Sequence, residues 1–153
     1  MSANSLGLCV LGLGNPLMGD DGIGVVVARR LRELEIKGAR VFEAGTPGYG
    51  LFDVFAEEKR VVFIDAVDSG SSPGSVDWVD PQAVIADKAR QSLHQVGLAD
   101  VLSLLDVAQN KPWVRVIGIQ PQQINVGVEI SEELNGKLVD ITETTLAMIK
   151  SIV

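Results

Sequence analysis

An apolar segment, a glycine-rich loop and an amphipathic segment follow one another near the start of the sequence. Residues 8–13 (LCVLGL) form a short, continuous apolar run, which is typical of a strand covered on both faces. From Gly22 onward the apolar residues recur at helical spacing, and arginines occupy the opposite side. This order of strand, loop and helix favours folds in which helices pack against a sheet.

The same alternation continues along the chain. Strand-like segments cover residues 40–44, 60–66, 76–79 and 114–119. Helical patterns cover residues 98–105 and one final helix that begins after Ser131 and runs to Ile152. Residues 51–57 form a short amphipathic segment, and the type of residues 81–91 stays open. We expect an α/β three-layer sandwich, with a mainly parallel twisted sheet and helices on both faces. The sequence of 153 residues has no linker or repeat, so residues 1–153 are expected to form a single domain.

Charge and composition restrict the partners of the chain. The formal net charge of −7 argues against nucleic acid or an anionic membrane as the main partner. The single cysteine, Cys9, cannot form an internal disulfide and lies in the first strand, where a buried thiol is inert. No segment approaches the ~18 consecutive apolar residues of a membrane span, and no secretory signal is visible. These features predict a cytoplasmic protein.

Polar residues stand where the predicted strands end. Ligands of α/β proteins bind beyond the carboxyl ends of the strands. The polar residues expected there are Asn15, Asp20, Asp21, Glu43, Thr46 and Asp65. A dinucleotide fingerprint would need a third glycine at the position of Leu17, and the two aspartates would repel a phosphate at the helix start. One carboxylate of this pair could cap the helix while the other points into the crevice.

Two aspartates and one histidine remain as candidate metal-binding or catalytic residues. The segment GSSPG resembles a serine-hydrolase elbow, but Pro73 follows the serine and lacks the N–H group that an oxyanion hole requires. Asp21, Asp65 and the only histidine, His94, could bind a divalent metal and leave coordination positions open. The structural alternative is a helix cap, a turn aspartate and a packed histidine.

Five blocks of the sequence follow one another in a recognisable order: GLGNPLMGDDGIG, EAGTPGYGL, IDAVDSGSSPG, SLHQVGLADVL and GIQPQQINVGVEIS. In this order they resemble the blocks of the nickel–iron hydrogenase maturation proteases. The resemblance extends from about Leu8 to Ser131, and the final helix fits in length and pattern. It implies an endopeptidase that removes the C-terminal extension of a hydrogenase large-subunit precursor after nickel insertion. It also implies an α/β sandwich, in agreement with the strand and helix pattern.

The resemblance assigns metal contact and catalysis to Asp21, Asp65 and His94. Some members of the family have glutamate at the position of Asp21, and the shorter aspartate would shift the metal by about a methylene. The implied nickel is a cofactor that the substrate precursor supplies, rather than one permanently bound to the enzyme. It would position the scissile peptide and polarise its carbonyl or activate a water, with one carboxylate as general base.

A substrate cleft would lie beside these three residues. It would include Asn15, Gly45 and Thr46, although Asn15 and Thr46 could equally brace loops. Three other functions stay open. A chaperone could bind the metal-loaded precursor without cutting it, and a zinc peptidase could carry its own metal. The motif GLGNP also resembles the start of peptidyl-tRNA hydrolases, but this chain lacks an early histidine and is acidic.

Overall fold

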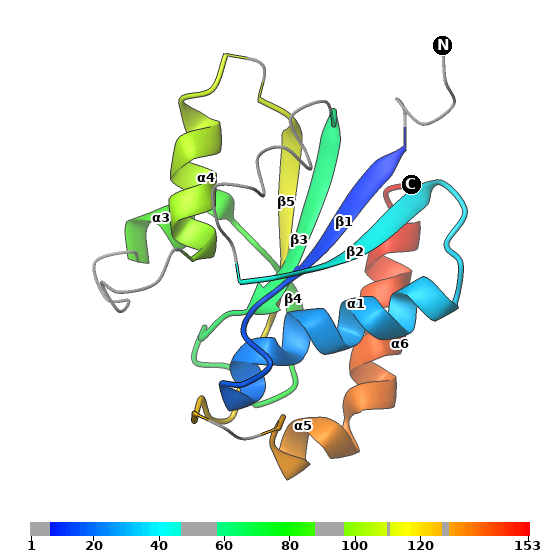
Figure 1. Cartoon of the computed structure of the whole chain (residues 1–153), viewed down its shortest axis with the longest axis vertical. Coiled ribbons are helices and arrows are strands. Elements are labelled where there is room, and N and C mark those ends of the chain that lie inside the picture. Colours follow the sequence, from blue (N-terminus) through cyan, green and yellow to red (C-terminus); the bar gives the residue numbers. More distant parts are fainter. Residues whose placement is uncertain (1–6, 47–57, 88–96, 110, 127–128) are drawn as a thin grey trace.

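The core of the chain is a five-stranded sheet in the order β2-β1-β3-β5-β4 (Figure 1). The computed structural model describes residues 7–46, 58–87, 97–109, 111–126 and 129–153. The strands are β1 (Leu8–Leu13), β2 (Ala39–Gly45), β3 (Arg60–Ala66), β4 (Val76–Val79) and β5 (Trp113–Ile119). Strands β2, β1, β3 and β5 run parallel, and β4 pairs antiparallel with the edge of β5. The mainly parallel sheet predicted from the sequence is therefore confirmed.

Helices cover both faces of this sheet. They are the short 3-10 helix η2 (Gly19–Gly22), α1 (Ile23–Glu33), α3 (Pro81–Ala86), α4 (Leu98–Asp106), α5 (Glu132–Gly136) and α6 (Leu138–Lys150). Helices α1 and α6 pack on one face and share a core with Leu8 and Val10 of β1. Helices α3 and α4 pack on the other face against Cys9, Leu11 and Leu13 of the same strand. Alternate residues of β1 thus enter two apolar layers, as expected for a strand buried on both faces.

Glycines let α1 approach the ends of β1 and β3 closely. A Cβ atom added to Gly24 would lie 2.2 Å from the carbonyl oxygen of Ile64 and 2.4 Å from that of Leu13. A Cβ atom added to Gly12 would lie 2.4 Å from the Cβ atom of Ala28. Only glycine fits at these two positions. The glycines thus allow the first turn of α1 to pack directly over the boundary between the two strands.

The prediction of one continuous final helix is wrong. The hydroxyl of Ser131 accepts a hydrogen bond from the Leu134 N–H at 3.3 Å and starts α5 as predicted, but α5 ends at Gly136. Lys137 leaves helical geometry, with φ −104° and ψ 3°, and its ammonium group binds the carbonyl oxygen of Pro73 at 2.9 Å. Glycine is a weak helix former, so the chain turns here before α6 begins.

Two further segments were uncertain or short in the sequence. Residues 81–86, left open by the pattern, form α3, because Asp80 accepts a hydrogen bond from the Gln82 N–H at 2.9 Å and Pro81 occupies the first helical position. The amphipathic segment predicted at residues 51–57 lies outside the described residues.

Candidate functional site

The order of the strands reverses at β1, so the carboxyl ends of β1 and β3 lie side by side at one edge of the sheet. The chain passes from β1 through α1 to β2 on one side, whereas β3 lies on the other side of β1. Ligands of open α/β sheets bind in the crevice expected at such a reversal of strand order. Asp21 lies in η2, the first element after β1, and Asp65 is the penultimate residue of β3. The two carboxyl groups interact electrostatically, so the structure brings them together at this edge.

A tight loop fixes the position of Asp21. Its carboxylate accepts a hydrogen bond from the Asn15 N–H at 2.9 Å, and the Asn15 side chain accepts one from the Leu17 N–H at 2.9 Å. Gly14 has φ 119°, and a Cβ atom there would lie 1.8 Å from the Asp21 carbonyl oxygen. Only glycine fits this turn. The side chain of Asn15 therefore braces the loop that carries Asp21.

The carboxyl group of Asp65 is strongly affected by its surroundings. Burial raises its pKa most, the negative charge of Asp21 raises it further, and a hydrogen bond from the Ala66 N–H at 2.8 Å opposes both effects. The resulting pKa is about 8. A cation placed near this carboxyl group would favour its ionised form.

Asp20 has a different role from the one expected of the aspartate pair. It is completely buried, and neither η2 nor α1 has a side-chain cap. Its carboxylate instead accepts hydrogen bonds from the N–H groups of Gln122 (2.9 Å), Gln123 (3.1 Å) and Ser131 (2.6 Å), and from the Ser131 hydroxyl (2.8 Å). Burial alone would raise the pKa of Asp20, but these hydrogen bonds lower it below its usual value. Asp20 therefore anchors a distant loop beside Asp21.

Glu43 does not contribute a free carboxylate to the crevice. Its two oxygens pair with Arg29 Nε and Arg32 Nη1 of α1, each at 2.8 Å. These arginines lie on the outer surface of the helix, so Glu43 joins β2 to α1. At the end of β2, the carbonyl oxygen of Gly45 accepts a hydrogen bond from the Gly14 N–H at 3.0 Å, and Thr46 is exposed.

Gln120 is another buried polar residue, and unlike Asp20 it was not predicted from the sequence. Its side-chain oxygen accepts hydrogen bonds from the N–H groups of Ser69 (2.8 Å) and Ser71 (3.3 Å), and its amide donates to Asp68 at 3.0 Å. Gln120 thereby organises the loop after β3 and confirms that the GSSPG segment is a turn. Its place directly after the buried strand β5 was the available signal.

His94 and Cys9 are the two remaining candidates from the sequence. His94 lies outside the described residues, and no three His, Cys, Asp or Glu side chains within the described ranges form a group that could hold a metal. Cys9 is completely buried, and burial raises the pKa of its thiol to about 12, so its assignment to core packing is confirmed. None of the helices in the described parts of the chain is both long and apolar enough to span a bilayer.

Comparisons with known proteins agree on one family. The hydrogenase maturation protease family matches residues 25–148. The hydrogenase expression/formation protein HupM from Azotobacter chroococcum is 30% identical over 155 residues, which cover 97% of this chain and 74% of HupM. The maturating endopeptidase HybD from E. coli has a similar structure, with a TM-score of 0.78, 26% identity and coverage of 95% and 93% of the two chains. The maturation protease HycI from Thermococcus kodakarensis gives a TM-score of 0.73, 26% identity and coverage of 97% and 95%.

Proposed function

The chain belongs to the family of hydrogenase maturation proteases, and on that premise we propose that it removes the C-terminal extension of a hydrogenase large-subunit precursor after nickel insertion. The observation that carries this proposal is the electrostatic interaction between Asp21 and Asp65 in the crevice at the ends of β1 and β3. Two neighbouring carboxyl groups can supply part of a cation-binding site, because a cation offsets the repulsion between them.

The substrate would bring the cation. Nickel held by the precursor would contact Asp21 and Asp65, and His94 would supply the third contact. Asp65 retains its proton near neutral pH while no cation is present, because its pKa is about 8. A positive ion favours the ionised form and would displace this proton. The site would therefore distinguish a metal-loaded precursor from an empty one by charge.

Cleavage would then follow from position and proton transfer. Nickel gripped by the three side chains would fix the nearby scissile peptide, and one carboxylate would act as general base toward a water. Gly45 and Thr46 would line the cleft for the peptide tail, and Asn15 would hold the loop that carries Asp21. A covalent route through Cys9 is unsuitable, because that thiol is buried on the core side of β1 and stays protonated.

Mass spectrometry of the precursor tests the proposal. The protein is incubated with a large-subunit precursor from the same organism, once loaded with nickel and once without it. We expect shortening of the nickel-loaded precursor alone. A precursor that is bound but never shortened would identify a chaperone instead. Metal analysis of the purified protein separates a third case, since stoichiometric zinc would identify a peptidase with its own metal.

A further inference from the structure

Two arginines and two tryptophans form an alternating series of cation–π contacts at the opposite end of the sheet. The Cζ atom of Arg60 lies 4.9 Å from the ring centroid of Trp113. The Cζ atom of Arg115 lies 5.3 Å from the centroid of Trp113 and 5.2 Å from that of Trp78. We call these four residues the Arg–Trp ladder.

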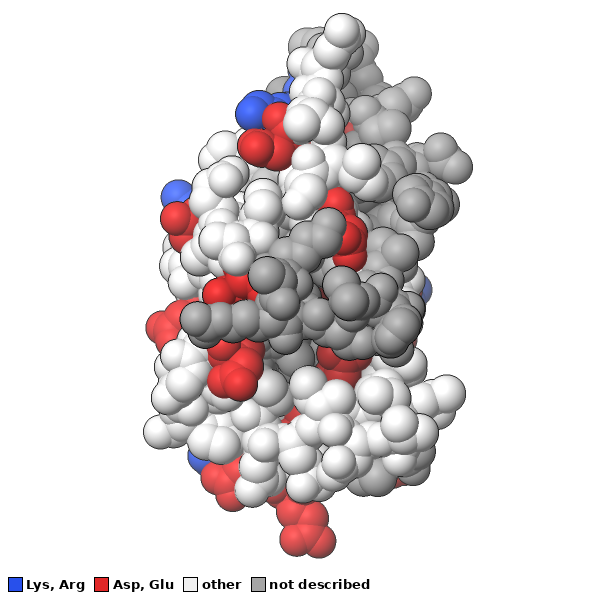
Figure 2. Space-filling model, turned by 90° about the vertical axis from the view of Figure 1, so that its left-hand side faces the viewer, with Lys and Arg blue, Asp and Glu red and all other residues white. Residues whose placement is uncertain are grey.

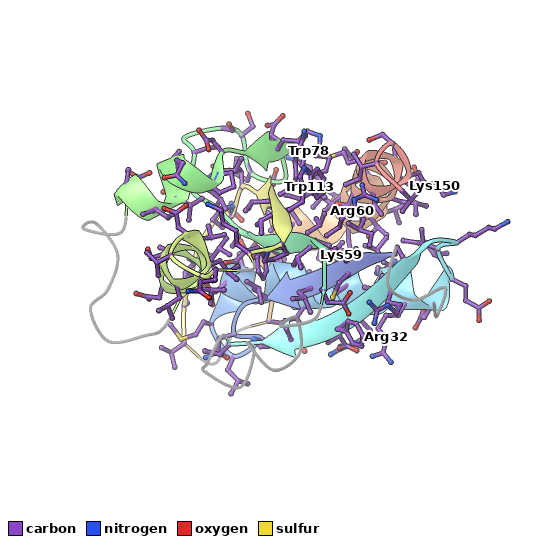
Figure 3. The ribbon with its side chains drawn as sticks, turned by 90° about the horizontal axis from the view of Figure 1, so that it is seen from above. Arg32, Lys59, Arg60, Trp78, Trp113 and Lys150 are labelled. Atoms are coloured by element: carbon purple, nitrogen blue, oxygen red, sulfur yellow. The ribbon has the colours of Figure 1, made fainter. Side chains whose placement is uncertain are left out.

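The strand register explains why the ladder forms. Arg60 of β3 stands opposite Trp113 of β5, and Arg115 follows two residues later on the same strand, so its side chain projects from the same face. Trp78 of β4 stands opposite Ile117, which places it diagonally from Arg115. Figure 3 shows Trp78, Trp113 and Arg60 in succession, and Lys59 and Lys150 lie on the same side of the view.

Most N–H donors of the ladder have no acceptor within the described residues. A cation–π contact holds the guanidinium group over the tryptophan ring and does not by itself use its N–H donors. Arg60 donates to the carbonyl oxygen of Ile152, beyond the end of α6. Neither Arg60 nor Arg115 forms an ion pair with a carboxylate among the described residues. By contrast, Arg29 and Arg32 share Glu43, and Arg40 pairs with Glu58.

We propose that the Arg–Trp ladder is a docking site for an acidic peptide segment of a partner protein. Guanidinium groups bind carboxylates with two parallel hydrogen bonds, and stacking on tryptophan has already restricted their side chains. Trp113 is 39% exposed and offers apolar surface beside the charges. The ladder is also unusual for this chain, which has a net charge of −7 and whose charged side chains on the face in Figure 2 are mostly acidic.

Charge favours a short acidic peptide over nucleic acid. A nucleic acid carries phosphates continuously along its length, and the net charge of −7 opposes the binding of such a long polyanion. A short peptide segment needs to match only the two guanidinium groups. Because the ladder lies at the amino ends of β3 and β5, and Asp21 and Asp65 lie at the carboxyl ends, this docking site is separate from the proposed protease site.

Intrinsic fluorescence provides a direct test, because Trp78 and Trp113 are the only two tryptophans of the chain. The intact protein is titrated with a peptide of alternating glutamate and glycine residues. We expect a saturable change in fluorescence that weakens as salt is added. Arg115→Gln should weaken binding at least about fivefold, which corresponds to the loss of one charge-assisted contact. Arg115→Lys keeps the charge but loses the planar donors, so it should also bind more weakly.

A matched control and two contrary results make the test decisive. Arg30→Gln removes the same charge from an exposed position of α1 and should bind the peptide like the unmodified protein. Unchanged fluorescence with the peptide, or equal binding by Arg115→Gln, would overturn the proposal. Tighter binding of a single-stranded oligonucleotide than of the peptide would overturn it in favour of a nucleic-acid site. Cleavage of the nickel-loaded precursor by Arg115→Gln should stay normal, so this proposal and the proposed protease function can fail independently.

Discussion

Burial and the negative charge of Asp21 together raise the pKa of Asp65 to about 8. The two residues belong to different segments, and the meeting of β1 and β3 at the centre of the sheet brings their side chains into one crevice. Folding thus holds a carboxyl group in a place where it resists ionisation. This arrangement lowers stability at neutral pH, but it prepares the crevice for a cation.

The stability of the protein should therefore depend on pH through Asp65. Its pKa is 3.8 in an ordinary setting and about 8 in the folded protein. Between these values the folded state binds more protons than the unfolded chain, so the free energy of unfolding falls as pH rises, by up to roughly 1.4 kcal/mol per pH unit. Asp65→Asn should flatten this slope and raise stability at neutral pH, as measured by urea unfolding at several pH values. An identical slope in the variant would contradict the pKa of Asp65.

Removing the charge of Asp21 should make Asp65 easier to ionise. In Asp21→Asn, the repulsive contribution to the pKa of Asp65 is absent, while the effect of burial persists. We expect the Asp65 pKa to fall and to remain above its ordinary value, as followed by NMR of the side-chain carboxyl carbon. A pKa that does not move would show that the two carboxyl groups do not interact.

Loss of the Asp21 carboxylate should stop proteolysis without unfolding the protein. We expect Asp21→Ala to lower the rate of precursor cleavage at least about 100-fold, the usual contribution of one acid–base group. His94→Ala should have a similar effect if it completes the metal contacts. Glu43→Gln is the control. The sequence also placed this carboxylate near the end of a strand, but in the structure it pairs with Arg29 and Arg32. Equal losses in Asp21→Ala and Glu43→Gln would point to general destabilisation.

Asp20 should contribute more to stability than any exposed carboxylate. Asp20→Ala leaves the N–H groups of Gln122, Gln123 and Ser131 without their acceptor. We expect the free energy of unfolding to fall by about 2–4 kcal/mol. Glu143→Ala, at an exposed position of α6, should change it by less than about 0.5 kcal/mol. Comparable effects of the two variants in urea unfolding would show that the anchor is weak.

The contact between α1 and the strand ends should not tolerate a methyl group. In Gly24→Ala the new Cβ atom would meet the carbonyl oxygens of Ile64 and Leu13, so α1 must move away from the sheet. We expect a loss of about 1–3 kcal/mol in stability and a slower cleavage reaction, because Asp21 precedes this turn. Gly136→Ala meets no atom within 4 Å and serves as the control. Its melting temperature should stay the same or rise.

The fold could be predicted where local patterns carry the information. Strand β3 is a continuous apolar run, and its predicted range, residues 60–66, agrees with the structure. The meeting of Asp21 and Asp65 could be inferred because parallel strands bring their carboxyl ends to one edge. The break between α5 and α6 was missed, although Gly136 was a signal for a helix end.

Long-range partners could not be predicted in the same way. The donors that bind Asp20 lie 102 to 111 residues further along the chain, and most are backbone N–H groups, which leave no mark in the sequence. The pairing of Glu43 with Arg29 and Arg32 likewise depends on how α1 lies over β2. For this reason the prediction from the sequence grouped Glu43 with the residues of the crevice.

The anchor between Asp20 and Ser131 also sets an order on synthesis. The ribosome makes the N-terminal part first, so Asp20 leaves it long before its partners exist. Until Ser131 has been added, the Asp20 carboxylate lacks two of its four hydrogen bonds. A chain cut before residue 131 would therefore hold the turn that carries Asp21 less firmly. Assembly of this end of the molecule requires that synthesis has passed residue 131.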